Sequence, residues 1–178
     1  MKKLILFTLT LVFMFGAGCI KQPQQIFTTT TTFDREMAEH QLRPGNNTIK
    51  GSALLRQSGG GVVTGAGNKV GLVPFTPYAQ ERMGKIYLNE NGGYNRLGFQ
   101  GLLERDISTP KAPGYDEAVK ETTADAQGFF TFNNLADGTY YVMTTIAWVV
   151  ANQPQGGALM KKVSVSGGEV KEVVLTAP

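Results

Sequence analysis

The chain has 178 residues, 17 of them basic and 14 acidic, with a single histidine and a single cysteine. Two of the basic residues stand at positions 2 and 3, so the rest of the chain is close to neutral, and it contains no run of Lys or Arg. These properties argue against a nucleic-acid-binding surface. The length suits one hydrophobic core and not two.

The first eighteen residues have the order of a secretory signal. Lys2 and Lys3 are followed by an apolar run over 4–15, which ends in the small residues Gly16, Ala17 and Gly18. A helix that crosses a membrane needs roughly 20 apolar residues, and this run is shorter. We therefore expect residues 1–18 to be a cleaved signal peptide.

Cys19 follows these small residues directly, and the segment resembles the lipobox of bacterial lipoproteins, with Gly16 where that family usually has leucine. The resemblance implies cleavage between Gly18 and Cys19, diacylglycerol on the sulfur and an acyl chain such as palmitate on the new amine. Acyl chains of this kind hold a domain on a membrane without a spanning helix. Ile20 in place of aspartate implies the outer membrane, with the domain facing the periplasm. The alternative is a spare thiol in a signal peptide cut elsewhere.

Residues 19–46 are expected to form a flexible tether. They include Gln22, Gln24 and Gln25 and an unbroken run over Thr28–Thr32, a composition that cannot bury enough apolar area to order itself. A short helix is predicted over 34–42, where Glu36 and His40 share one face. One carboxylate and one imidazole leave a metal site short of ligands, so this pair is interpreted as solvated.

From residue 47 to residue 178 the pattern is that of an all-β domain. Short alternating apolar runs are separated by glycine-rich turns, which is typical of a β-sandwich, here of about seven strands. A main strand is predicted over 70–78, at an edge or bent because it contains Pro74 and Pro77. The glycines match neither a dinucleotide-binding loop nor a phosphate-binding loop.

The most informative segment is 122–148. Asp125 and Gly128 predict a tight turn, after which Phe130 and Phe132 point to one side of a strand. The spacing Asp-x-x-Gly-x-Phe-x-Phe-x-x-Leu-x-x-Gly-x-Tyr-x-Val, which runs from Asp125 to Val142, is similar to that of the carboxypeptidase regulatory-like domain. This resemblance implies an Ig-like, prealbumin-like (transthyretin-like) sandwich that ends in a hairpin of 159–165 and 170–176.

No catalytic set is expected, so the chain is not predicted to be an enzyme. Its one histidine lies in the tether, which excludes a histidine-based triad or a zinc peptidase centre within the domain. The carboxylates that remain as candidates for acid–base work are Glu104, Asp106, Asp116 and Glu117, and solvated loop charges explain them more simply. No cofactor or metal is predicted.

The region over about 78–120 is a long insertion between strands, partly helical at 79–88. Long connections of this kind are often functional. The candidate binding surface consists of aromatic residues from the insertion and one at the end of a strand: Tyr87, Tyr94, Phe99, Tyr115 and Trp148. The alternative is that the aromatics of the insertion cover an open edge of the sandwich.

These features together predict a non-catalytic, membrane-anchored lipoprotein of the bacterial cell envelope. Its expected role is that of a structural or protein-interaction module, with a partner protein that the sequence does not identify. The alternative is a carbohydrate- or peptide-binding module that uses Trp148 and the aromatics of the insertion.

Overall fold

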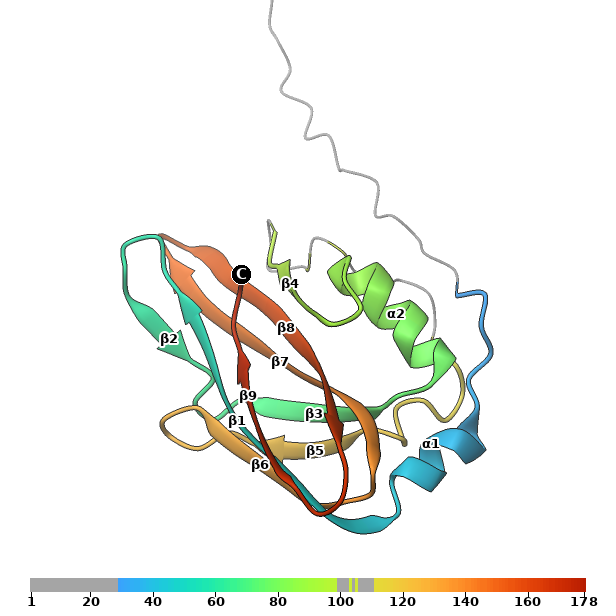
Figure 1. Ribbon diagram of the computed structural model, residues 1–178. Coiled ribbons are helices and arrows are strands. Elements are labelled where there is room, and N and C mark those ends of the chain that lie inside the picture. Colours follow the sequence, from blue (N-terminus) through green and yellow to red (C-terminus); the bar gives the residue numbers. More distant parts are fainter. Residues whose placement is uncertain (1–28, 99–102, 104, 106–110) are drawn as a thin grey trace, which may run out of the picture.

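The computed structural model describes residues 29–98, 103, 105 and 111–178. Two helices and nine strands lie within these residues (Figure 1). In chain order they are α1 (Arg35–Gln41), β1 (Pro44–Arg56), β2 (Val62–Thr64), β3 (Lys69–Pro74), α2 (Pro77–Tyr87), β4 (Gly92–Arg96), β5 (Lys120–Thr123), β6 (Phe129–Leu135), β7 (Gly138–Val150), β8 (Gln153–Val165) and β9 (Val170–Leu175).

The strands form two sheets that pack face to face, which confirms the predicted all-β sandwich (Figure 1). One sheet has the order β4-β8-β7-β3-β5. In the other, β1 pairs with β6 and β2 along one side and with β9 along the other. The count is higher than the seven strands expected because β2 and β4 are short strands that the alternation of apolar residues does not reveal.

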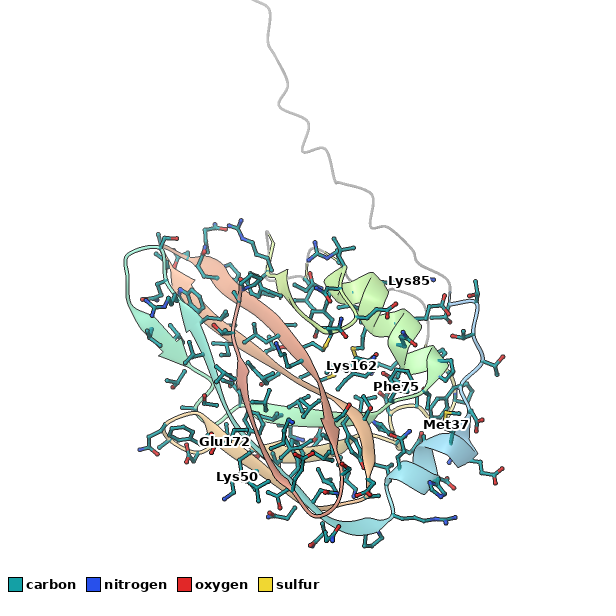
Figure 2. The ribbon with its side chains drawn as sticks, viewed as in Figure 1. Met37, Lys50, Phe75, Lys85, Lys162 and Glu172 are labelled. Carbon is teal, nitrogen blue, oxygen red and sulfur yellow. The ribbon has the colours of Figure 1, made fainter. Side chains whose placement is uncertain are left out.

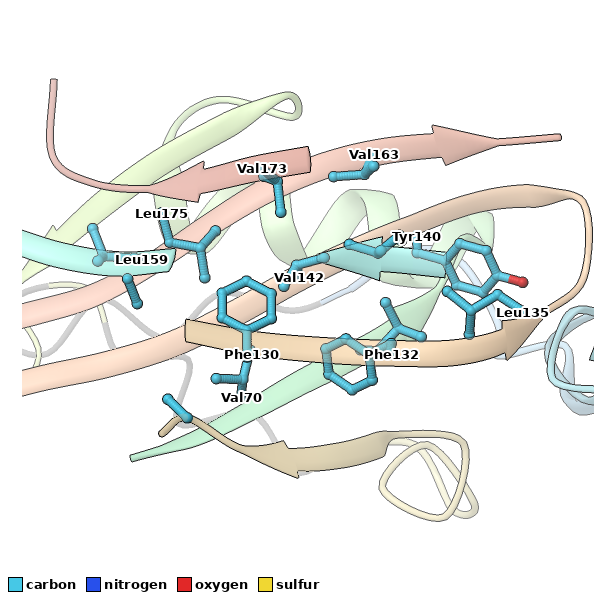
Figure 3. Close-up of a cluster of buried hydrophobic side chains, with 14 of the residues drawn as sticks. Val70, Phe130, Phe132, Leu135, Tyr140, Val142, Leu159, Val163, Val173 and Leu175 are labelled. Atoms are coloured by element: carbon cyan, nitrogen blue, oxygen red, sulfur yellow. The ribbon is translucent and has the colours of Figure 1, made fainter. Parts of the chain in front are cut away.

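The main core lies between the sheets and follows the period-two alternation of the strands. Phe130 and Phe132 point inward from β6, with ring centroids 6.1 Å apart, and meet Tyr140 and Val142 of β7 (Figure 3). The buried Tyr140 satisfies its hydroxyl by donating to the carbonyl of Gln41 at 2.8 Å and to that of Ala136 at 3.0 Å. The strand faces predicted from sequence are therefore correct.

The turn before β6 has the predicted chemistry. One carboxylate oxygen of Asp125 accepts hydrogen bonds from the backbone amides of Gln127 and Phe129, both at 2.9 Å. Gly128 has a φ of +88°, a conformation that favours glycine, and a Cβ there would lie 3.0 Å from the carbonyl oxygen of Ala53. Aspartate and glycine thus shape this turn together.

Strand β3 differs from the prediction for 70–78. It ends at Pro74 and lies inside its sheet, between β7 and β5, rather than at an edge. The prolines end the strand instead of bending it. Pro77 starts α2 in the first turn, where proline lacks no needed donor, and the Thr76 hydroxyl caps the helix by accepting from the Ala79 amide at 3.1 Å.

The C-terminal strands do not form the predicted hairpin. Strand β8 belongs to the five-stranded sheet, whereas β9 crosses to the other sheet and pairs in parallel with β1. Gly167 and Gly168 make the crossing with φ values of +67° and +81°. Alternation is the same for a strand in either sheet, so it could not distinguish these two arrangements.

A buried asparagine fastens the chain at this crossing. The Nδ2 of Asn47 donates to the carbonyl of Leu135 at 3.0 Å and to the carboxylate of Asp137 at 2.8 Å. Its Oδ1 accepts from the amides of Gly168 at 2.8 Å and Glu169 at 3.1 Å. Asn47 is fully buried, so these bonds replace those it would make with water.

The insertion covers the outer face of the five-stranded sheet. A second apolar cluster lies between α2 and this face, where Met83 and Tyr87 of the helix pack with Val73 and Tyr141 of the sheet. Strand β4 also extends the sheet by pairing with β8. The insertion therefore covers an edge, as the alternative proposed, and part of one face as well.

The chain before α1 lies against the domain from Thr30 onward. The Glu81 carboxylate of α2 accepts from the backbone amides of Thr30 and Thr31 at 2.9 Å and from both threonine hydroxyls. Together with Lys85, these bonds hold the pKa of Glu81 well below its usual range. The tether predicted over 19–46 therefore includes a docked end, because a carboxylate on α2 satisfies its polar backbone.

Helix α1 confirms the short helix predicted over 34–42. The Asp34 carboxylate caps it by accepting from the Met37 amide at 2.9 Å. Within the described part of the chain, neither α1 nor α2 is long and apolar enough to cross a membrane.

Candidate binding groove

Two of the predicted binding residues, Tyr87 and Tyr115, lie in the second apolar cluster and not at the surface. Only 4% of Tyr87 and 5% of Tyr115 is exposed. Tyr115 packs edge-on against Phe33 and Tyr78, with centroids 5.5 and 5.1 Å apart. Their rings cannot stack on a ligand at the surface, so this part of the sequence-based surface is wrong.

Tyr94 and Trp148 are half-buried against the main core. The Tyr94 hydroxyl donates to the carbonyl of Gly156 at 2.7 Å. The Trp148 ring lies over Gly156 so closely that a Cβ there would come within 3.0 Å of it. Both side chains therefore pack on the β8 backbone. Cys19 and Phe99 lie outside the described residues.

Of the four candidate carboxylates, only two lie among the described residues. Asp116 pairs with the Lys111 ammonium at 2.6 Å, and Glu117 is exposed, while Glu104 and Asp106 lie outside the described residues. In the described part of the chain, no three His, Cys, Asp or Glu side chains come together as a metal site.

The structure instead places a hollow on the covered face, beside α2. This outer groove has a volume of about 920 Å³ and is bounded by β3, β5, β7, α2 and the segment 111–119. Its lining consists of an apolar floor and a polar rim: Asn68, Lys69, Gly71, Val73, Arg82, Met83, Ile86, Lys111, Tyr115, Asp116, Val119, Glu121, Met143, Thr144 and Thr145.

The floor is open at Gly71, where β3 lacks a side chain. A Cβ at this position would meet Met143 Cγ and Val119 Cγ1 at 3.4 Å, an ordinary contact, and the backbone is not in the left-handed region. A larger residue at 71 is therefore compatible with the strand and would fill the floor of the groove.

The rim carries two ion pairs. The Lys69 ammonium lies 2.5 Å from the Glu121 carboxylate, and the Lys111 ammonium lies 2.6 Å from that of Asp116. All four side chains are at least half exposed, so each pair contributes about 1 kcal/mol or less to stability. These charges cancel in pairs and leave Arg82 as the unbalanced charge of the lining.

Arg82 is the least expected residue of the groove. It is 5% exposed, and its guanidinium lies over the rings of Tyr78 and Tyr115, 5.7 and 5.6 Å from their centroids. Its Nη1 is buried and has no hydrogen-bond partner, and among the described residues no carboxylate lies within ion-pair distance. The two cation–π contacts stabilise the buried guanidinium by about 2 kcal/mol each at most, whereas burial of an unpaired charge costs several kcal/mol.

Arg105 shows how the same side chain is satisfied elsewhere in the insertion. Its Nε donates to the carbonyl of Ile86 at 3.0 Å, and its Nη2 donates to that of Tyr94 at 3.1 Å. A buried amide, Asn95, holds the Arg105 backbone at both its amide and its carbonyl. Among the described residues, the arginine of the groove therefore lacks the hydrogen-bond partners that the other arginine of the insertion has.

The phenols beneath the groove are neutral over the physiological pH range. Burial raises the pKa of Tyr115 well above its usual value, although the nearby Arg82 charge opposes part of that rise. Burial also raises the pKa of Tyr141 to about 12. Both hydroxyls are buried, and neither has a hydrogen-bond partner among the described residues. The Tyr115 hydroxyl thus adds a second unused polar group to the groove lining.

The sequence analysis missed Arg82, although a signal for it was present. In the predicted helix 79–88, Ala79, Met83 and Tyr87 recur every four residues and mark the apolar stripe. Arg82 directly precedes Met83 and belongs to this stripe by the three-residue spacing from Ala79. A charged residue on the buried stripe of an amphipathic helix is the pattern that would have indicated the groove.

The outer face of the four-stranded sheet, here called the bare face, is a second surface with exposed apolar groups. Phe129 is 57% exposed and Val174 is 53% exposed, and both pair in register with Ser52 of β1. Lys50 and Glu172 lie beside them on the same sheet, away from α2 (Figure 2). Neither helix nor the described part of the insertion covers this surface (Figure 1).

Comparison with known proteins shows a similarity to a solved structure. No protein-family model and no curated protein matches the chain. Among solved structures, the chain is similar to a crystal structure from Pseudomonas aeruginosa described as a putative carbohydrate binding protein. The two share 26% sequence identity with a TM-score of 0.64, over 81% of this chain and 97% of that one.

Proposed function

We propose that the chain is a non-catalytic carbohydrate-binding module that a lipid on Cys19 holds at a bacterial outer membrane, facing the periplasm. The observation that carries the proposal is the outer groove, which combines an apolar floor with polar side chains at its rim. A sugar presents apolar C–H faces and a ring of hydroxyls, and binding sites for small ligands pair apolar walls with a few placed polar groups in the same way.

The similarity to the Pseudomonas aeruginosa structure supports this choice among the functions expected from sequence. It favours the carbohydrate-binding alternative over a purely structural role. The site differs from the one expected, because Tyr87 is not part of the groove lining and Tyr115, which is, has a buried ring that cannot serve as a stacking platform. Hydrogen bonding by Asn68, Asp116 and Glu121 takes the place of aromatic stacking.

The anchor is proposed from the sequence. The basic start, the apolar run and Cys19 after three small residues support a lipoprotein, and the resemblance to carboxypeptidase regulatory-like domains fits an envelope protein. Labelling of cells with radioactive palmitate tests it. Wild type is expected to take up label and Cys19→Ser to lose it and leave the membrane fraction, whereas membrane retention of Cys19→Ser would contradict the anchor.

An oligosaccharide array probed with the full chain tests the groove. We expect Gly71→Val to lose the sugars that wild type retains, because its side chain fills the floor between Met143 and Val119. Gly59→Val is the matched control, since a Cβ at Gly59 has no atom within 4 Å. Equal retention by both variants would place the sugar elsewhere, and retention of no sugar by wild type would contradict the function.

Protein interaction is a second candidate function, and the bare face favours it. Exposed Phe129 and Val174 flank Ser52 on a sheet surface that no helix covers. Crosslinking in intact envelopes tests this role with Val174→Lys, which places a charge on the face. Loss of a wild-type crosslink would support a partner there, and an unchanged set of crosslinks would oppose it.

A further inference from the structure

Arg82 gives the outer groove a charge preference, provided that the proposed carbohydrate-binding function holds. We propose that the groove takes an acidic sugar whose singly charged group, a carboxylate or a sulfate ester, lies against the Arg82 guanidinium. The inference deepens the proposed function by naming the class of saccharide.

The first argument is the state of the guanidinium itself. Arg82 lines the groove, is 5% exposed and has a buried Nη1 without a hydrogen-bond partner. Guanidinium nitrogens carry donors in a planar fork that matches the two oxygens of a carboxylate. An anion in the groove would therefore use donors that the described residues leave unused.

The second argument is the charge balance of the lining. Among the described lining residues, Lys69 pairs with Glu121 and Lys111 with Asp116, so one positive charge remains, that of Arg82. A carboxylate or a sulfate ester balances that charge one to one. A phosphate monoester carries about −1.5 to −2 at neutral pH and would leave an excess of negative charge in a partly apolar groove.

The third argument is the support behind Arg82. The guanidinium lies over the rings of Tyr78 and Tyr115, 5.7 and 5.6 Å from their centroids, and the Tyr78 hydroxyl accepts from the Ala112 amide at 2.8 Å. This contact ties the segment over the groove to the helix that carries Arg82. The charged group is thus held in place before a ligand arrives, which limits the entropy lost on binding.

Titration calorimetry with the full chain tests the inference. The probes are tetrasaccharides of galacturonate and of glucuronate-containing chains, their carboxyl-reduced neutral counterparts, and a sulfated galactose tetrasaccharide. Wild type is expected to bind at least one acidic probe roughly tenfold or more tightly than its neutral counterpart, as for a hydrogen bond to a charged group. Whether a uronate or the sulfated probe binds tells which anionic group the groove takes.

Arg82→Met and Arg82→Lys distinguish the effect of the positive charge on binding from that of the guanidinium shape. Arg82→Met should lower the affinity for the acidic probe to that of its neutral counterpart and leave the neutral probe within about twofold. Arg82→Lys keeps the charge without the fork and should retain part of the preference. Arg56→Met, on an exposed arginine at the end of β1, removes the same charge from the other sheet and should change neither affinity.

The outcomes distinguish the inference from the function on which it rests. Equal binding of acidic and neutral probes, with no effect of Arg82→Met, would overturn the charge preference and leave carbohydrate binding in place. Binding of neither kind of sugar would overturn both. Thermal unfolding of Arg82→Met guards against a folding defect, because removal of an unpaired buried charge should leave the midpoint at or above that of wild type.

Discussion

The two outer faces of the sandwich are built from the same kind of extended chain but differ in what lies on them. The five-stranded sheet is covered by α2, β4 and the segment 111–119, which add a second apolar cluster and enclose the outer groove. The four-stranded sheet keeps its outer face bare, with Phe129 and Val174 more than half exposed. This difference shows that an insertion packed on the outer face of a sheet can form a groove lined by buried polar groups.

The covered face also contains a buried charge that lowers the stability of the fold, and the bare face does not. Arg82 is buried there without a carboxylate partner in the described chain, whereas Lys50 and Glu172 on the bare face are exposed to solvent (Figure 2). Exposed charges cost little, and an unpaired buried one costs several kcal/mol. Such a cost is typical of a residue kept for binding rather than for stability.

Truncation of one aromatic side chain on each face gives the largest contrast. Tyr141→Ala should lower the free energy of unfolding by about 3–5 kcal/mol, because Tyr141 is fully buried under α2 and its loss leaves a cavity. Phe129→Ala, on the bare face, should change it by about 0.5 kcal/mol or less. Urea denaturation measures both. Similar losses of stability in the two variants would mean that a side chain in the second apolar cluster contributes no more to the free energy of unfolding than an exposed side chain does.

Replacement of the buried arginine tests the cost assigned to the covered face. Arg82→Met should raise the free energy of unfolding by about 1 kcal/mol, since methionine fills the space without an unpaired charge and offsets the lost ring contacts. Arg56→Met should leave it within about 0.5 kcal/mol. A large loss of stability in Arg82→Met would identify Arg82 as structural and weaken the binding interpretation.

Acid should release the N-terminal segment from the covered face before the sandwich unfolds. The folded pKa of Glu81 lies below its unfolded value, so its stabilisation is present at neutral pH. It is lost as the pH falls below about 4.3, the ordinary value for glutamate. The protection factors of the Thr30 and Thr31 amides, which correct for the slower intrinsic exchange in acid, should therefore fall below about pH 4.

Glu81→Gln provides the control for this pH effect. It removes the carboxylate that accepts from Thr30 and Thr31, so both amides should have low protection factors that change little with pH. The same acid dependence in Glu81→Gln as in wild type would assign the effect to another group.

The smallest expected effect concerns the floor of the groove. Gly71→Val and Gly59→Val should each change the unfolding midpoint by only a few degrees, because neither position has a positive φ or a close backbone contact. A collapse of Gly71→Val alone would mean that the floor cannot hold a side chain, and loss of binding in that variant would then reflect misfolding.

The sequence predicts most of the sandwich because its signals are local. Alternation over Phe130 and Phe132 and the turn chemistry of Asp125 and Gly128 act within a few residues, and the structure has them as expected. The sheet to which β9 belongs depends on its parallel pairing with β1, which is distant in sequence. The alternation of apolar residues within β9 does not indicate that partner.

The candidate site was harder to predict because it depends on the packing of the insertion. Aromatic residues in a segment without a clear period suggested an exposed surface, yet Tyr115 and Tyr87 fill the space between α2 and the sheet. Whether an aromatic ring is buried depends on what folds over it. Composition alone therefore could not show which of these aromatic rings are buried.

Mapping of a bound oligosaccharide by NMR tests the central claim, that the sugar occupies the covered face, most directly. The probe is the tetrasaccharide that wild type binds most tightly, titrated into the ¹⁵N-labelled full chain. We expect the largest amide shift changes at Gly71, Val119 and Met143, around the groove floor. Changes centred on Ser52, Thr131 and Val174 of the bare face, with the groove amides unmoved, would contradict the account.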